Sequence, residues 1–171
     1  MVESQLQEKI DPHRLPKHIA VIMDGNGRWA QKNSLPRVEG HWAGVKAVDR
    51  IVSLGCKLNL EALTLYSFSD ENWNRPSAEI GTLMKILDHF LKKELNRMKE
   101  ENIQFNTIGH IEELPASIQK LIQYSIDETR NNTGMILTLA LSYGGRQEIM
   151  DAVRKVAQMV KEGQILPEDI D

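Results

Sequence analysis

The chain has 171 residues, of which 41% are hydrophobic and 26% charged, the proportions of a soluble globular protein with one core. A net charge of −3 argues against general nucleic-acid binding, and the single cysteine, Cys56, excludes an intrachain disulfide and a cysteine-built zinc site. No apolar run is long enough to span a membrane and the first residues do not resemble a signal peptide, so we expect a cytoplasmic protein.

Strand-like and helix-like segments alternate from residue 17 onward, whereas residues 1–16 are polar and aperiodic and are expected to form a flexible N-terminal arm. Short apolar runs predict strands at His18–Met23, Glu61–Phe68, Ile103–Gly109 and Met135–Ser142. Apolar residues at helical spacing predict helices that include residues 42–52, 80–98, 118–126 and 149–160. This order predicts an α/β fold, a single domain over residues 17–171 with a mainly parallel sheet flanked by helices.

The first strand runs directly into the turn Asp24-Gly-Asn-Gly-Arg28, and a helix can begin at Trp29. Gly25 and Gly27 can adopt positive φ and let a ligand approach the backbone, while the first N–H groups of the helix attract an anion. Arg28 suits phosphate oxygens, and Asp24 could hold Mg²⁺ against them. An ordinary tight turn accounts for the same letters, so the interpretation needs support from elsewhere in the chain.

Polar residues also follow the later strands, and the carboxyl ends of parallel strands meet at one edge of a sheet. Arg37 and His41 stand at the entry to a helix, and Arg75 and Arg146 follow the second and fourth strands. Together with Arg28 they predict a site for a doubly charged, phosphate-like anion.

Bulky apolar side chains accompany this polar edge. Leu83, Met84 and Phe90 lie on the long helical stripe that follows the second strand, and a groove beside them would suit an isoprenoid tail. Trp73, in an acid-rich loop, either covers an apolar ligand or packs within its own loop. At the end of the chain, Pro167 and the acids after it read as the start of a helix, which favours a piece of a longer polypeptide.

Four stretches carry a resemblance to a known family: HIAVIMDGNGRWA, PRVEGH, LYSFSDENWNRPSAEI and LALSYGGRQEI. In this order and spacing the chain resembles the cis-prenyltransferases, specifically the bacterial undecaprenyl diphosphate synthases, over nearly everything from Lys17 onward. It departs from the family pattern at Ser142, where asparagine is frequent, and at Ser67, where alanine is common. The resemblance implies an undecaprenyl diphosphate synthase-like fold that is incomplete at its C-terminus, because family members continue for several dozen residues.

The activity implied by the resemblance is condensation of isopentenyl diphosphate onto an allylic diphosphate, usually farnesyl diphosphate, with formation of Z double bonds. The implied product is undecaprenyl diphosphate, for the lipid carrier of cell-wall synthesis, and the implied cofactor is Mg²⁺. The resemblance further implies a homodimer with no nucleic-acid partner, located in the cytoplasm or peripherally at the inner face of the membrane, to which the product is delivered.

Site roles follow from the motifs and the resemblance together. Catalytic roles are implied for Asp24, which would also bind Mg²⁺, and for Asn72. Substrate-binding roles are implied for Gly25, Asn26, Gly27, Arg28, Trp29, Arg37, His41, Ser69, Trp73, Arg75, Glu79 and Arg146. A tunnel for the growing tail would be lined by Leu83, Ile103 and Met135.

Other classes of protein fit the sequence less well. A P-loop phosphotransferase would end its turn with Gly-Lys-Ser/Thr, which is missing here, and a haloacid-type phosphatase would place an acid where Asn26 stands. Two alternatives stay open: a shortened, inactive form, and a non-catalytic partner subunit of a prenyltransferase. Such subunits typically lose the aspartate and the glycine turn, both of which are intact here.

Overall fold

The computed structural model describes residues 10–11 and 14–170, so most of the predicted N-terminal arm over residues 1–16 lies outside the described residues. In the described part, a parallel sheet is formed by β1 (His18–Ile22), β2 (Ala62–Ser69), β3 (Gln104–Ile108) and β4 (Ile136–Tyr143). The strands lie in the order β1-β2-β4-β3, so β4 is inserted between β2 and β3. The carboxyl ends of all these strands therefore face the same edge of the sheet.

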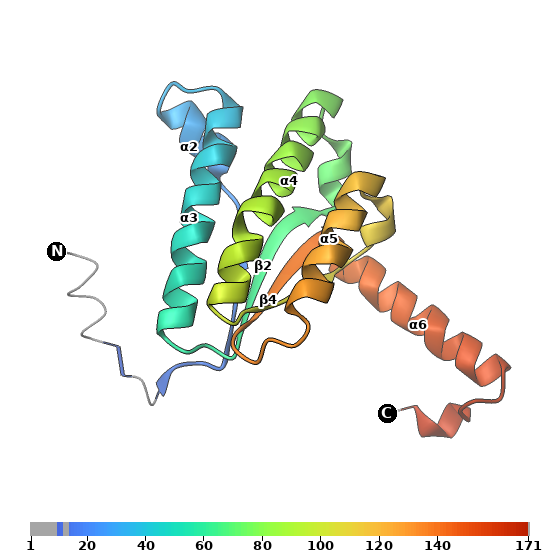
Figure 1. The fold of residues 1–171 in the computed structure, drawn as a ribbon. Coiled ribbons are helices and arrows are strands. Elements are labelled where there is room, and N and C mark those ends of the chain that lie inside the picture. Colours follow the sequence, from blue (N-terminus) through green and yellow to red (C-terminus); the bar gives the residue numbers. More distant parts are fainter. Residues whose placement is uncertain (1–9, 12–13, 171) are drawn as a thin grey trace.

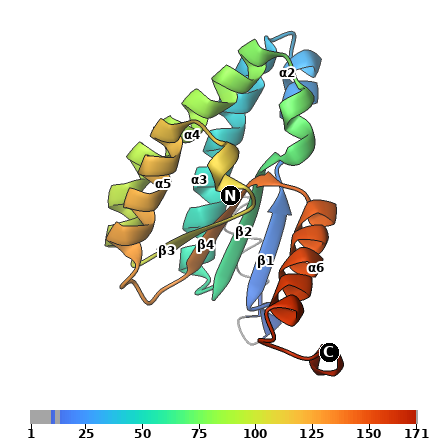
Figure 2. The same cartoon turned by 90° about the vertical axis from the view of Figure 1, so that its right-hand side faces the viewer.

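Helices cover the sheet unevenly. The longer ones are α3 (Arg37–Lys57), α4 (Ser77–Glu100), α5 (Ala116–Thr129) and α6 (Gly145–Lys161). The shorter ones are α2 (Asn26–Lys32) and the 3₁₀ turns η2 (Asp70–Asn74), η3 (Ile111–Glu113) and η4 (Pro167–Asp169). Helices α3, α4 and α5 lie on one face of the sheet, whereas α6 runs on the other side, alongside β1 (Figures 1 and 2).

The core lies between the sheet and the three helices on its covered face. Leu63 and Leu65 of β2 and Leu137 and Leu139 of β4 point toward these helices and are at most 2% exposed. Burial of each such side chain stabilises the fold by roughly 1.5–3 kcal/mol, so this alternation in the two central strands accounts for the position of the sheet. Strand β4 is buried on both faces, which explains why its apolar run in the sequence is nearly continuous.

The predicted α/β fold is confirmed, with small differences at element ends. Each strand begins within one residue of its predicted start. Helix α3 begins at Arg37, several residues before the apolar stripe, because Pro36 occupies its N-cap with φ fixed near −57°. The loop after β2 forms the 3₁₀ turn η2, which apolar periodicity does not predict.

Helix α6 differs from the other long helices, because none of its residues is buried. Its apolar stripe would normally face a core, yet Ile149 is 65% exposed and Val153 is 57% exposed. Nearby Ile22 at the end of β1 is 78% exposed. The described residues therefore leave an apolar surface along α6 and the free edge of β1 without cover. Within the described ranges, no helix combines the length and the apolar character needed to span a membrane.

A charged pair joins α6 to the rest of the molecule. His110, just after β3, lies with Nε2 2.7 Å from the Asp151 carboxylate of α6. This hydrogen bond raises the pKa of His110 and lowers the pKa of Asp151. The contribution of His110 is complete below its unfolded pKa of about 6.5 and disappears as pH rises through the raised value. The contribution of Asp151 is present above its unfolded pKa of about 3.9 and disappears as pH falls through the lowered value.

We therefore expect α6 to be held most firmly between about pH 4 and about pH 6.5. Amide protection factors in α6 should fall when the pH is raised from about 6 to about 8.5, while those in α5 stay constant. Hydrogen exchange measured by mass spectrometry at both pH values provides the test. Asp151→Asn should abolish the difference, and a difference that survives in this variant would contradict the assignment.

Candidate active site

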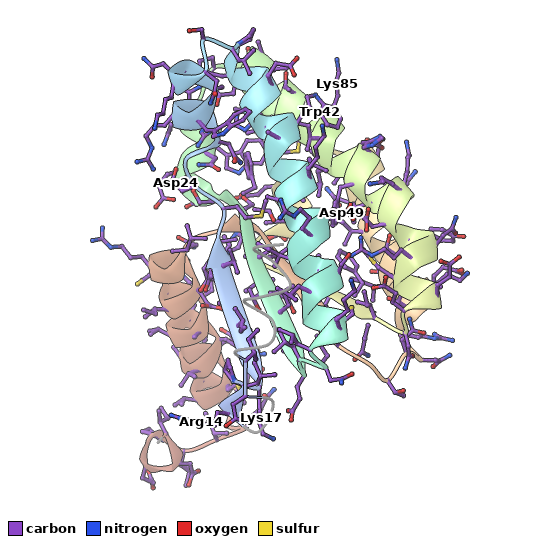
Figure 3. The ribbon with its side chains drawn as sticks, turned by 90° about the vertical axis from the view of Figure 1, so that its left-hand side faces the viewer. Arg14, Lys17, Asp24, Trp42, Asp49 and Lys85 are labelled. Atoms are coloured by element: carbon purple, nitrogen blue, oxygen red, sulfur yellow. The ribbon has the colours of Figure 1, made fainter. Side chains whose placement is uncertain are left out.

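The turn after β1 has the conformation that its glycines allow. Gly25 has φ +90°, a region that favours glycine, and its carbonyl accepts the Trp29 N–H at 2.8 Å to start α2. Asp24 lies at the carboxyl end of β1, facing solvent (Figure 3). One of its carboxylate oxygens accepts a hydrogen bond from Arg28 Nη2 at 2.7 Å. The acid and the arginine predicted for this turn are therefore held side by side.

Glycines of α3 allow the turn to lie against that helix. A Cβ on Gly40 would lie 2.0 Å from the backbone oxygen of Asn26, and one on Gly44 would lie 2.6 Å from the side-chain nitrogen Nδ2 of Asn26. Gly27 itself faces Arg37, whose guanidinium would be 3.0 Å from a Cβ at that position. The close approach brings Arg37 of α3 next to the turn that follows β1.

Three basic side chains converge on one oxygen of Glu79, in the first turn of α4. Arg75 Nη1 donates to Glu79 Oε1 at 2.8 Å, and Arg37 Nη2 and His41 Nε2 lie 3.5 and 3.4 Å from the same atom. Burial raises the pKa of Glu79, but the hydrogen bond from Arg75 and the charge of Arg37 outweigh it, so that this pKa lies below its ordinary value. Glu79 is thus a carboxylate that holds basic side chains from α3 and from the loop before α4 together.

The loop after β2 is fixed by its own side chains. The Ser69 N–H donates to Asn72 Oδ1 at 3.2 Å, which holds Asn72 at the start of η2. Trp73 donates from Nε1 to Ser142 Oγ at 2.7 Å and packs edge-to-face on Phe68 with ring centroids 4.9 Å apart. These contacts hold Trp73 of η2 against β2 and β4, beside the cavity mouth.

A cavity of about 230 Å³ opens at this edge of the sheet. Its mouth is polar and contains the Asp24–Arg28 turn, Arg37, His41, Asn72 and Arg75. Its inner walls are apolar and come from α3, α4 and β4: Val45, Val48, Leu83, Met84, Ile86, Leu87, Phe90, Leu139 and Leu141. Fixed donors and cations at the mouth suit a diphosphate, and the walls suit a hydrocarbon chain.

The predicted anion site is therefore assembled only in part. Arg28, Arg37 and Arg75 share the cavity with Asp24 and the glycines, whereas Arg146 is outside its lining. Arg146 lies in the first turn of α6, which leaves β4 on the opposite side of the sheet from α3 and α4 (Figure 2). Arg146 still lies near the same edge of the sheet. Hydrogen bonds from the backbone and from Ser69 lower the pKa of Glu71, and the positive charge of Arg146 lowers it further.

Other predicted residues lie close to the cavity or far from it. Trp29, on α2, and Ser69, just before η2, do not line it, and Glu79 acts on it through its three basic partners, Arg37, His41 and Arg75. Of the predicted tunnel residues, Leu83 lines the cavity. Ile103 is fully buried before β3, and Met135 lines a second cavity at the amino-terminal ends of the strands. These two residues lie at the opposite end of the sheet from the turn.

Sequence reasoning did not single out several cavity residues: Met23, Val45, Val48, Ser67, Phe68, Ile86, Leu87, Leu139 and Leu141. Helical spacing placed Val45 and Val48 on an apolar stripe but could not separate the part of the stripe that lines a cavity from the part that fills the core. The signal that could have identified Val45 and Val48 as cavity residues is their position one to two turns beyond His41 on α3.

The cavity mouth offers a carboxylate that could hold Mg²⁺. In the described residues, no group of three or more histidine, cysteine or acidic side chains could hold a metal ion. Mg²⁺ in phosphate-binding sites, however, is commonly held by one or two carboxylates together with the phosphates themselves. The exposed carboxylate of Asp24 at the cavity mouth fits this arrangement, in which a diphosphate would supply the other oxygens.

The single thiol is not part of this chemistry. Burial and a hydrogen bond with Glu101 raise the pKa of Cys56 to about 12. The thiol is therefore protonated at neutral pH and is a poor nucleophile.

Comparisons with a family model and with individual relatives point to the same family. Residues 22–171 match the family model described as "Putative undecaprenyl diphosphate synthase". The chain is 46% identical over 169 residues to an isoprenyl transferase of Heliobacterium mobile and 48% identical over 170 residues to one of Bacillus subtilis strain 168. Each match covers 99% of this chain and 65% of the relative, so the chain spans just under two thirds of these relatives' length.

Solved structures agree. Lavandulyl diphosphate synthase from Lavandula x intermedia, in complex with dimethylallyl diphosphate, superposes with a TM-score of 0.88 at 36% identity, over 91% of this chain and 67% of that chain. A probable undecaprenyl diphosphate synthase from Campylobacter jejuni gives a TM-score of 0.69 at 30% identity, over 83% and 62% of the two chains. The chain therefore belongs to the undecaprenyl diphosphate synthase family of isoprenyl transferases.

Proposed function

We propose that this protein is a cis-prenyltransferase that condenses isopentenyl diphosphate onto an allylic diphosphate, with farnesyl diphosphate as the first acceptor. The observation that carries the proposal is that one and the same cavity has a mouth of glycine amides and basic side chains and apolar inner walls. A ligand with a diphosphate head and a hydrocarbon tail matches both parts. The solved relative bound to dimethylallyl diphosphate supports an allylic diphosphate as the ligand class.

In the proposed reaction, a carbon–carbon bond forms between the two substrates while the bond between the allylic carbon and the diphosphate breaks. A proton then leaves to give the new Z double bond. Negative charge accumulates on the departing diphosphate, and fixed positive groups aimed at that charge accelerate the step.

Residues of the mouth supply these positive groups. The backbone of Gly25 and Gly27, together with Arg28 and Arg37, would cradle the leaving diphosphate. Asp24 would hold Mg²⁺, which when bound supplies Lewis-acid stabilisation to the same oxygens. Asn72 lines the mouth beside them and would position the reacting groups.

The remaining parts of the proposal follow the family. The product would be undecaprenyl diphosphate, the carrier lipid of cell-wall synthesis. The enzyme would act as a homodimer in the cytoplasm and deliver its product to a membrane.

A condensation assay tests the proposed function. Radiolabelled isopentenyl diphosphate, farnesyl diphosphate and Mg²⁺ should give labelled polyprenyl diphosphates, and calorimetry should show binding of farnesyl diphosphate alone. Binding without condensation would favour the non-catalytic alternative, and absence of both would refute the assignment.

The length of the product provides a separate prediction. Leu83 of α4 lines the cavity, so Leu83→Ala removes bulk from its wall and should shift the products toward longer chains. Thin-layer chromatography of the dephosphorylated lipids gives the measurement. Leu95→Ala, on the same helix but outside the cavity lining, is the matched control and should leave the ladder unchanged. An identical ladder in both variants would remove Leu83 from the path of the tail.

A further inference from the structure

Ser142, at the carboxyl end of β4, has an unusual backbone for a strand residue. Its φ is +45°, in the left-handed region that favours glycine, and the residue is only 2% exposed. The loop after β3 holds this conformation, because the N–H of His110 donates to the Ser142 carbonyl at 3.1 Å. Backbone strain of this kind persists where the surrounding structure fixes it, and it commonly marks a functional position.

The hydroxyl group of Ser142 joins two segments that are far apart in the sequence. It accepts a hydrogen bond from Trp73 Nε1 at 2.7 Å and donates its own proton to the carboxylate of Glu113 in η3. An indole N–H can only donate and a carboxylate can only accept, so each bond has one possible direction. Glu113 therefore turns the hydroxyl proton away from Trp73 and leaves a lone pair facing the indole. The charged acceptor also polarises the hydroxyl group and so strengthens its bond with Trp73.

Trp73 carries this arrangement to the cavity mouth. It lies in η2 directly after Asn72, which lines the mouth. Its bond to Ser142 ties the turn to β4, and its ring contact with Phe68 ties the turn to β2. These contacts matter because η2 is a short 3₁₀ turn in which no residue is buried. The position of Asn72 therefore depends on a hydrogen bond whose direction Glu113 sets.

The groups that would cradle the diphosphate are held by other elements. The glycine turn after β1 packs on α3, and Arg37 and Arg75 both lie against Glu79 of α4. A shift of η2 therefore displaces Asn72 more than it loosens the grip on the diphosphate. Loss of the Glu113 carboxylate should accordingly slow the chemical step and leave binding nearly intact.

We propose that Glu113 is a positioning residue of the active site, which acts through Ser142 and Trp73 on Asn72. This inference rests on the proposed function, since it concerns the step in which Asn72 would position the reacting groups. Glu113 does not line the cavity, so it acts on the reaction only through these contacts. It neither gives nor takes a proton in the reaction.

The first test is the indole N–H signal of Trp73 in a proton–nitrogen correlation NMR spectrum, identified as the signal that Trp73→Phe removes. Glu113→Ala should move this signal upfield, because the bond from the indole to Ser142 weakens. Glu113→Gln keeps an acceptor oxygen and should restore most of the wild-type position. The signals of Trp29 and Trp42 should stay where they are. An unmoved Trp73 signal in Glu113→Ala overturns the inference.

The second test is steady-state condensation kinetics, with kcat expressed per farnesyl diphosphate site counted by calorimetry. Glu113→Ala should lower kcat about tenfold and keep the KM for farnesyl diphosphate within about twofold, and Glu113→Gln should recover most of kcat. A merely structural role of Glu113 would reduce the number of binding sites instead. A wild-type kcat per site in Glu113→Ala therefore also overturns the inference.

Glu112→Ala is the matched control. Glu112 is the neighbour of Glu113 in η3, and each carboxylate lies 3.7 Å from His110 Nδ1, but the Ser142 hydroxyl donates to Glu113. This variant should keep the wild-type kcat and the wild-type Trp73 signal. A wild-type chain that gives no condensation would refute the proposed function, while the Trp73 signal would still report on the contact with Glu113.

Discussion

Replacing Asp24 by alanine should lower the turnover of the condensation reaction by about 10²–10³-fold while farnesyl diphosphate still binds. Asp24 is the carboxylate at the cavity mouth that faces solvent and pairs with Arg28. Loss of its charge removes the group that would hold Mg²⁺ against the leaving diphosphate, and this contact strengthens as the bond breaks. Steady-state kinetics with labelled isopentenyl diphosphate and calorimetry with farnesyl diphosphate separate turnover from binding.

Asp70→Ala is the control for this substitution. Asp70 lies at the same edge of the sheet in η2 and is also exposed, but it is outside the cavity lining. It should retain nearly full turnover. Turnover of Asp24→Ala that stays at the wild-type level with saturating Mg²⁺ would contradict the metal role of Asp24.

Gly40→Ala should lower the free energy of unfolding by about 3 kcal/mol and abolish binding of farnesyl diphosphate. Its new Cβ would lie 2.0 Å from the backbone oxygen of Asn26 and 3.0 Å from the Ala30 Cβ. Because the nearest atom belongs to the backbone, α2 must move away from α3, and the turn that begins at Asp24 must move with it. Denaturant unfolding gives the stability change, and calorimetry gives the affinity.

Gly81→Ala provides the matched control. Gly81 lies inside α4, is exposed, and has no atom within 4 Å of the position that a Cβ would occupy. Alanine there should raise the free energy of unfolding by about 0.5–1 kcal/mol, because glycine is a poor helix former. If the two substitutions had similar effects, the close packing of α2 on α3 would not be what positions the turn.

The local sequence predicted most of the architecture. Apolar runs located the starts of the four strands to within a residue. In β4, side chains buried on both faces of the sheet leave an uninterrupted apolar signal. The Asp24–Arg28 turn was likewise readable, since glycines, an acid and an arginine after a strand are locally sufficient to shape it. Arg37 and Arg75 could be assigned to the same edge because each lies between a predicted parallel strand and the helix that follows it.

Contacts between distant segments were beyond such reasoning. Nothing in the local pattern indicates that one oxygen of Glu79 gathers Arg37, His41 and Arg75, because their positions depend on how α3 packs beside α4. Arg146 follows a strand as Arg75 does, yet the course of α6 carries it out of the cavity. The apolar stripe of α6 predicted a buried face, and the described residues leave it exposed.

The amino-acid sequence by itself thus determines the α/β class, the glycine turn and the basic character of one sheet edge, because each depends on residues close together in sequence. Only the tertiary structure decides where the cavity ends and which cations enter it. These features depend on packing between α3, α4 and β4, whose contacting residues are separated by dozens of positions, and no local periodicity encodes the distance between them.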